Sequence, residues 1–545
     1  MSKQGLVRGS SIMVTAIGIA KFLGIISIVP INQLLGNVGQ GFYSTAYNLY
    51  TILMVLAQGG LPTALSKLIS ERASGGNYLE IEQLYRFTLK LVSFFAVIGA
   101  LLVWFGAPYY ATLVALHATK QDIAEMTISV RALAPAILIV PFESALRGYL
   151  QGFQEVRGPA LSQVSEQLFR VLVAVLGTLF IVKMGMGVAK GAAAATFGAF
   201  VGAIAGVFIL WQAIVPLRKK NRPQFTSKSQ TTSNGTIRRM LYAVALPVCL
   251  GSLVVPISSN VDSLTVVNFL THFAGQTFNQ AQASFGILSR QAQNLVQLPL
   301  AFTIAVGFSV MPAISAAKSQ NDQTDVQLNI ITPIRMMFIV TFPSAAVFFA
   351  LARPIEFMFS NSYDGANIIA TISFMCIFSS MELMSTYILQ GLGNFYQAVR
   401  NMFLGVALKA ILNILLIILL KSVIGAAIAT ILGYMLSSTL NVLAVRKCSG
   451  VQFSVPRLAL PFLLASLPLL IELLLVNNIL SYLGASLPHN LAWAWNILQL
   501  LISCLIGSVL YVFIAIRLRL LRPKQLHSLP IVGHWLWHVT ERIAG

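Results

Sequence analysis

Long apolar blocks separated by short polar breaks run through the whole sequence, and this pattern limits the folds open to the chain. A helix needs about 20 consecutive, mostly apolar residues to cross the hydrocarbon core of a bilayer. Such blocks lie at residues 10–33, 43–66, 87–107, 128–150, 160–182, 190–215, 241–268, 283–309, 330–351, 366–390, 400–420, 424–445, 458–480 and 492–516. The pattern predicts an all-α polytopic membrane protein with about 14 transmembrane helices.

The composition supports this fold class. Apolar and aromatic residues make up 57% of the 545 residues, charged residues only 10%, and the mean hydropathy is +0.80. Soluble domains carry about 25% charged residues, so an ordinary soluble enzyme is excluded. The first block follows Lys3 and Arg8, as in a secretory signal, but it is longer than the about 7–15 apolar residues of such a signal. We expect it to be retained as the first span.

An internal repeat organises the chain. At a constant offset of 239 residues, Glu143 matches Glu382 and Arg170 matches Lys409. The basic, Ser/Thr-rich stretch at 218–239 is the longest polar segment and is typical of a linker. We therefore predict two six-helix lobes with two appended helices. The boundaries are 1–217 for the N-lobe, 218–239 for a cytoplasmic linker, 240–447 for the C-lobe, 448–517 for spans 13 and 14, and 518–545 for a basic cytoplasmic tail.

The distribution of charge predicts the orientation. Lys and Arg number 36 against 16 Asp and Glu, for a net charge of +20. Most basic residues fall in alternate loops and in the two termini, and the opposite loops hold only Lys120, Lys183, Lys190, Arg353 and Lys421. The positive-inside rule then places both termini on the cytoplasmic side of the membrane, which we expect to be a plasma membrane. Anionic lipid headgroups account for the basic loops, so membrane lipids are expected partners and nucleic acid is not.

Ionisable side chains inside the spans are the candidate functional residues, because each costs about 2.5–3.5 kcal/mol on insertion scales. The deep bases predict a cationic, substrate-binding cavity: Lys21, Arg170, Arg290 and Lys409. The acids are expected to balance these bases or to bind a coupling ion: Glu143, Glu166, Asp262 and Glu382.

Two alternatives apply to particular members of this set. Glu166 and Arg170 lie four residues apart on one helix, so they could pair with each other as a neutral structural element. Arg147 lies near the cytoplasmic end of its span, where its long side chain is expected to snorkel towards the headgroups. The four cysteines and six histidines show no ligand spacing, so neither a disulfide framework nor a metal site is expected.

One segment makes the sequence recognisable. Residues 147–171, RGYLQGFQEVRGPALSQVSEQLFRV, closely resemble the signature of Gram-positive polysaccharide-biosynthesis membrane proteins of the SpoVB/YtgP type. These are relatives of the MurJ lipid II flippases in the multidrug/oligosaccharidyl-lipid/polysaccharide (MOP) exporter superfamily. Residues 18–50 and 58–71 fit the same family. The resemblance implies a MATE-like fold with a central cationic cavity, and a groove formed with spans 13 and 14 for a polyprenyl tail.

The resemblance also implies a function. It implies flipping of an undecaprenyl-pyrophosphate-linked cell-wall precursor, with lipid II as the first choice, by alternating access. Lys21 occupies the position of an essential arginine of the family, whereas Ser27 and Leu53 stand at or near two further basic positions. No cofactor is implied beyond a coupling ion or the membrane potential, and cell-wall synthesis proteins are implied partners.

Four other functions are compared with this one. A flippase for another polyprenyl-linked polysaccharide precursor fits the same residues. An ion-coupled multidrug antiporter of the superfamily would use the acids, but the deep bases would repel a cationic drug. A membrane enzyme is not expected, because the outer loops are short and lack a DxD, HExxH or GxSxG motif. A scaffold for cell-wall synthesis would not need charges buried in both lobes.

Overall fold

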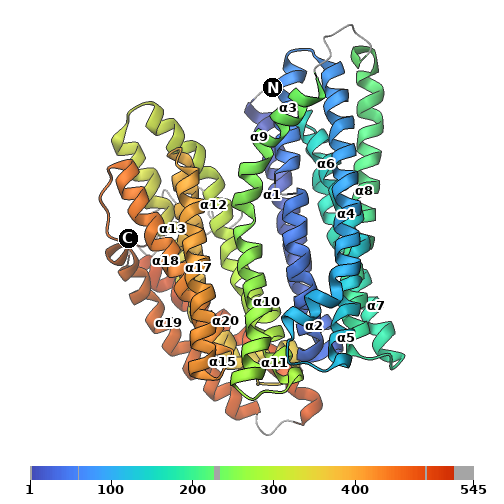
Figure 1. The fold of residues 1–545 in the computed structure, drawn as a ribbon. Coiled ribbons are helices and arrows are strands. Elements are labelled where there is room, and N and C mark those ends of the chain that lie inside the picture. Colours follow the sequence, from blue (N-terminus) through green and yellow to red (C-terminus); the bar gives the residue numbers. More distant parts are fainter. Residues whose placement is uncertain (1–2, 59, 226–232, 485–487, 519, 521–545) are drawn as a thin grey trace. The chain divides into compact units, whose positions relative to one another are not determined.

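The computed structural model of this chain describes residues 3–58, 60–225, 233–484, 488–518 and 520. Every regular element within these ranges is a helix (Figure 1). Twelve helices in the described residues are long and apolar enough to cross a membrane. These findings confirm an all-α, multi-pass membrane protein. The predicted tail lies outside the described residues, apart from Leu518 and Leu520.

The count of fourteen spans is not confirmed, because none of the twelve candidate spans in the described residues corresponds to the first predicted block, 10–33, or to the seventh, 241–268. The first block is interrupted at Ser27, which separates α1 from α2. The seventh block is interrupted at Leu253, which separates α9 from α10. Each of these blocks is therefore built from two helical pieces and not from one continuous helix.

By their internal contacts, the residues form two compact units. The first unit comprises residues 1–290 and 413–423. Its helices are α1 (Lys3–Ile26), α2 (Ile28–Gln58), α3 (Leu61–Ser74), α4 (Tyr78–Val114), α5 (Lys120–Arg131), α6 (Ala134–Gly152), α7 (Arg157–Lys183), α8 (Val188–Phe225), α9 (Asn234–Ser252), α10 (Val254–Phe273) and α11 (Phe278–Gly286). A π-helical segment, Ile287–Ala292, follows α11 and contains the boundary between the units.

The second unit comprises residues 291–412 and 424–545. Its helices are α12 (Gln293–Ser319), α13 (Gln323–Ala350), α14 (Ala352–Ser360), α15 (Ala366–Ile372), α16 (Met375–Gly391), α17 (Phe395–Leu420), α18 (Ile424–Ser449), α19 (Val455–Gly484) and α20 (His489–Arg517). Residues 413–420 at the end of α17 group with the first unit.

This division does not follow the predicted lobe boundary at 218–239. The basic residues at 218–225 continue α8, and α9 begins at Asn234. Helix α10 groups with α2 because polar side chains connect the two: Asn260 Nδ2 donates to the backbone oxygen of Asn48 at 2.7 Å, and Asn48 Nδ2 donates to Ser263 Oγ at 2.9 Å. The six-plus-six division of the repeat stays a prediction.

Glycines set the local geometry around two helices that matter for function. Gly36 adopts φ 63° and ψ −178°, which breaks α2 into two helical pieces between the first two predicted spans. A positive φ is available to glycine without the steric cost that a side chain would add. On α8, a Cβ at Gly198 or Gly202 would lie 2.6 or 2.5 Å from backbone oxygens of α7. These small residues allow α7 and α8 to approach closely, which fixes the position of α7.

Candidate functional site

Four charged side chains from α6 and α7 form a buried ionic cluster in the first unit. Arg147 Nη2 lies 2.6 Å from Glu143 Oε1, one turn away on α6, and 2.8 Å from Glu166 Oε2 on α7. Glu166 also pairs with Arg170, one turn further along α7. Arg147 Nε donates to Ser162 Oγ at 3.1 Å. The cluster contains two carboxylates and two guanidinium groups, so its formal charges cancel.

The burial of the cluster explains why it is paired. Glu143 is completely buried, and Glu166 and Arg170 are nearly so. Charges removed from water are tolerated only when partners compensate them, and hydrogen bonds between ionised groups supply the strongest compensation. The structure thus has the Glu166–Arg170 pair that the helical spacing offered as an alternative. The snorkelling prediction for Arg147 is wrong, because this side chain turns inward to bridge Glu143 and Glu166.

A ladder of three tyrosines on α2 connects this cluster to the next arginine. Tyr43 stacks on Tyr47 with ring centroids 5.7 Å apart, and Tyr47 lies 5.9 Å from Tyr50. The guanidinium carbon of Arg170 lies 5.8 Å from the Tyr50 ring, and its Nη2 donates to the Tyr50 hydroxyl at 3.5 Å. At the other end, the guanidinium of Arg290 lies 4.8 Å from the Tyr43 ring. Two deep arginines therefore contact one aromatic ladder, held by cation–π contacts.

These tyrosines are not among the site residues predicted from the sequence. Their numbers, 43, 47 and 50, follow the i, i+4, i+7 spacing of one helix face, so the signal was present. An aromatic stripe at helical spacing is ordinarily read as hydrophobic core. Its relevance appears only when Arg170 from α7 and Arg290 from the π-helical segment meet it in three dimensions.

The same helix buries polar groups beside the ladder. Gln40 and Ser44 are buried, and within the described residues neither the side-chain amide of Gln40 nor the hydroxyl of Ser44 has a hydrogen-bond partner. Buried polar groups are nearly always satisfied in native proteins, so such groups call for an explanation. A polar ligand that reaches this part of α2 would supply the missing partners.

The remaining predicted residues lie elsewhere. Lys21 is half-buried on α1 of the first unit. Asp262 on α10 is buried and accepts from Asn413 Nδ2 at 2.8 Å. Glu382 on α16 and Lys409 on α17 are buried within the second unit, and Glu382 Oε1 accepts from Thr386 Oγ1 at 3.0 Å. The structure thus gathers Glu143, Glu166, Arg170 and Arg290 around α2. A single cationic cavity formed by the four deep bases, and the balancing or ion-coupling role of the four acids, stay predictions.

Metal-binding side chains do not gather in the described part of the chain. No group of three or more His, Cys, Asp and Glu residues there is arranged to hold a metal ion. The described site offers guanidinium groups, carboxylates, tyrosine rings and amides, with three arginines against two glutamates. Such a set is suited to an anionic, hydrated group more than to a cation.

A known protein family matches more than half of the chain. The family described as polysaccharide biosynthesis protein matches residues 6–318, which include most of α1, all of α2 to α11 and nearly all of α12. This range contains the ionic cluster, the tyrosine ladder and Arg290.

Two named relatives match nearly the whole chain. The Bacillus subtilis (strain 168) protein "Lipid II flippase MurJ" is 25% identical over 546 residues, covering 96% of this chain and 97% of the relative. "Stage V sporulation protein B" of the same organism is 25% identical over 540 residues, covering 98% of this chain and 99% of the relative. These relatives confirm the resemblance seen in residues 147–171.

Solved structures show the same fold. A structure of lipid II flippase MurJ in an inward closed conformation matches with a TM-score of 0.64 and 17% identity, covering 93% of this chain and 98% of the other. An inward-facing multidrug resistance MATE family transporter of the MOP superfamily matches with a TM-score of 0.65 and 16% identity, covering 82% and 98%. The predicted MATE-like fold is confirmed by these similarities.

Proposed function

Because this chain belongs to the polysaccharide biosynthesis protein family, we propose that it flips lipid II, an undecaprenyl-pyrophosphate-linked cell-wall precursor, across a bacterial plasma membrane. The direction is from the cytoplasmic to the outer leaflet, with both termini in the cytoplasm. Relatives that are lipid-linked precursor flippases and transporters support membrane transport as the general activity. In this proposal the protein is a transporter and not an enzyme, and alternating access carries the substrate.

The observation that carries the proposal is the pair of arginines on the tyrosine ladder of α2. A diphosphate must exchange its hydration for fixed hydrogen-bond donors before it can enter a membrane interior. Arginine suits this task because it stays charged and presents a planar fork of N–H groups to phosphate oxygens. Arg170 and Arg290 lie at the two ends of the ladder, so they are separated by about two turns of α2.

The ionic cluster has a supporting role in this proposal. Glu166 contacts both Arg147 and Arg170, so it holds the Arg170 side chain at the ladder. A diphosphate that approaches Arg170 competes with Glu166 for the same guanidinium group. Glu143 and Glu166 are then the groups through which a coupling ion or proton would influence substrate binding. No cofactor enters the proposed cycle, and lipid-linked glycan and membrane lipids are the partners that it requires.

Substitution of Arg290 tests the proposal in cells. We expect Arg290→Gln to abolish growth when this protein is the only lipid II flippase present, because the substitution removes a charge but keeps a polar side chain. Arg353→Gln is the matched control, since Arg353 makes the same type of contact with Tyr363 at 5.1 Å in the second unit. Full growth of the Arg290→Gln strain at normal protein levels would contradict the proposal.

A flippase for another polyprenyl-linked polysaccharide precursor is the second candidate, and one observation favours it. Ser27 stands where the family resemblance implies a basic residue, and in the structure its side chain donates to the backbone oxygen of Gly24 at 2.6 Å. Ser27 therefore caps a backbone carbonyl at the break between α1 and α2, and it does not supply a charge. Competition between lipid II and another polyprenyl-diphosphate-linked glycan for the purified protein separates the two substrates, since the true substrate should compete at the lower concentration.

A further inference from the structure

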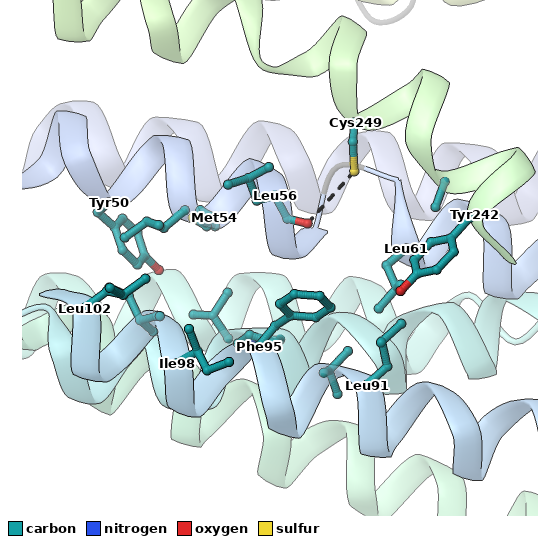
Figure 2. A pocket seen from close by; sticks show the side chains of 17 residues that line it. Tyr50, Met54, Leu56, Leu61, Leu91, Phe95, Ile98, Leu102, Tyr242 and Cys249 are labelled. Atoms are coloured by element: carbon teal, nitrogen blue, oxygen red, sulfur yellow. Dashed lines mark hydrogen bonds between the residues drawn. The ribbon is translucent and has the colours of Figure 1, made fainter. Parts of the chain in front are cut away.

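An apolar cavity lies next to the tyrosine ladder inside the first unit. It has a volume of about 380 Å³ and is lined by residues of α2, α3, α4, α6 and α9 (Figure 2). This volume falls within the about 300–1,000 Å³ that is usual for small-molecule pockets. Nearly all of its lining side chains are hydrocarbon, and the exceptions are Tyr50, Tyr242 and Cys249, with Met54 as a thioether.

The walls of the cavity differ in exposure. Val92 and Val140 are buried and form part of a closed wall. Phe95 is 54% exposed and Leu102 is 66% exposed, although both lie on the membrane-spanning helix α4. Exposed apolar side chains on such a helix face hydrocarbon and not water. The cavity is therefore open on its α4 side to the membrane interior.

The chemistry of the cavity excludes a polar occupant. An apolar cavity stays dry, since water needs two or more polar partners, and it accepts hydrocarbon. The cavity lies along α2 immediately after the ladder, from Tyr50 to Leu56. Figure 2 shows Tyr50 at one end, with Leu61 and Tyr242 at the other.

Tyr50 connects the cavity to the charged site. Its ring lines the cavity, while its hydroxyl accepts from Arg170. A lipid whose diphosphate lies at Arg170 has its first hydrocarbon units at this tyrosine. We propose that the cavity binds the diphosphate-proximal isoprene units of the transported lipid, an inference that rests on the proposed function.

In this proposal, the occupant of the cavity is the polyprenyl chain and not an acyl chain of a bulk phospholipid. The shared residue Tyr50 is the reason, because it borders the cavity and also contacts Arg170. A phospholipid carries a single phosphodiester and no diphosphate, so its acyl chain should occupy the cavity with little dependence on Arg170. The two occupants therefore differ in their dependence on the arginines.

Two glycines of α4 provide a matched pair of variants. Gly99 lines the cavity, and a Cβ added there would lie 3.1 Å from Ile137 Cγ2, which also lines it. Gly106 lies two turns further along α4, and a Cβ there would meet nothing within 4 Å. Gly99→Leu fills the cavity, whereas Gly106→Leu makes the same chemical change on the same helix outside it.

The experiment uses the full chain in nanodiscs with a polyprenyl diphosphate that carries a diazirine in its first isoprene units. We expect cross-links on residues 91–102 of α4 and on α9, and Gly99→Leu should reduce them by about tenfold while Gly106→Leu leaves them unchanged. Arg170→Gln should also reduce them. Equal labelling of wild type and Gly99→Leu, or cross-links confined to other helices, would overturn the proposal.

A second measurement does not depend on a variant that fills the cavity. Cys249 lines the cavity, so in a chain with Cys376, Cys448 and Cys504 replaced by alanine its alkylation rate reports occupancy. Polyprenyl diphosphate should slow the alkylation, and phosphatidylglycerol at the same concentration should not. Equal protection by both lipids would overturn the assignment. If wild type flips lipid II without cross-linking, only this inference fails; if it does not flip lipid II, the proposed function fails.

Discussion

The ionic cluster of α6 and α7 and its repeat counterpart on α16 and α17 show two ways to bury polar groups in one scaffold. At the offset of 239, Glu143 corresponds to Glu382 and Arg170 to Lys409. Between them, however, Arg147 is replaced by Thr386, and Glu166 by Gly405. The first unit thus holds a network of four ion-paired side chains. Of the four corresponding positions in the second unit, only Glu382 and Lys409 carry an ionisable side chain.

Hydrogen bonds replace ion pairs in the second unit. Thr386 Oγ1 donates to Glu382 Oε1 at 3.0 Å, Asn441 Nδ2 donates to Thr386 Oγ1 at 3.1 Å, and Asn401 Nδ2 donates to Asn441 Oδ1 at 3.0 Å. Gly405 packs against α18, where a Cβ would lie 2.6 Å from the backbone oxygen of Gly433. The space that a glutamate fills in the first unit is used for close helix packing in the second. The two repeats therefore share corresponding helices, but the side chains buried between those helices differ in charge and in hydrogen bonding.

The largest effect is expected from removing the shared carboxylate of the first unit. Glu166→Leu leaves Arg147 and Arg170 without this partner, and breaking a buried pair in this way costs about 3–5 kcal/mol in the free energy of unfolding. Thermal unfolding of the purified protein measures the loss. A change in stability no larger than that of a surface substitution would show that the cluster contributes little.

A double variant sharpens the comparison, because it gives the first unit the residues of the second. Arg147→Thr and Glu166→Gly each break the network alone, but together they remove one base and one acid. We expect the double variant to be less destabilised than the sum of the two single variants, with a coupling energy of about 1–3 kcal/mol. Strict additivity of the two unfolding free energies would mean that the residues act independently.

Glu382→Gln should have a smaller effect on stability. The amide keeps the hydrogen-bonding shape of the carboxyl group, and Thr386 is a neutral partner, so we expect a change of about 1 kcal/mol or less. The measurement is the same unfolding experiment. A loss as large as that of Glu166→Leu would contradict the distinction between ion-paired and hydrogen-bonded carboxyl groups.

A carboxyl group outside the spans provides the smallest and most specific test. Glu356 on α14 is buried, and burial raises its pKa to about 8, although Ser360 Oγ donates to Glu356 Oε1 at 2.6 Å and partly opposes the rise. Nearby Asp364 raises the pKa further. The folded state thus keeps this group protonated at pH values where the unfolded chain ionises it.

The sign of the pH dependence follows from this difference. The stability contributed by neutral Glu356 is complete below its unfolded pKa and decreases as the pH rises through about 8. The unfolding temperature of the wild type should therefore fall between pH 5 and pH 9 by more than that of Glu356→Gln. Parallel pH profiles of the two proteins would contradict this account.

Much of the fold could be predicted because hydropathy reports helices directly. The apolar blocks correspond to helices, and the four-residue spacing of Glu166 and Arg170 indicated their pairing. The position of Arg147 could not be predicted, since it depends on the approach of α6 to α7 and not on spacing along one helix. The breaks at Ser27 and Leu253 and the grouping of α10 with α2 also result from tertiary packing. The tyrosine ladder was overlooked because its pattern is common in hydrophobic cores.

The most direct test of the account is transport by the purified protein. Lipid II is placed in the inner leaflet of proteoliposomes that contain wild type, Arg290→Gln or Arg353→Gln, and its appearance in the outer leaflet is followed with an impermeant reagent. We expect lipid II to appear rapidly in the outer leaflet with wild type and with Arg353→Gln. With Arg290→Gln, the rate should be near that of protein-free liposomes. Equal rates for all three proteins would contradict the claim that the arginines on the tyrosine ladder bind the diphosphate.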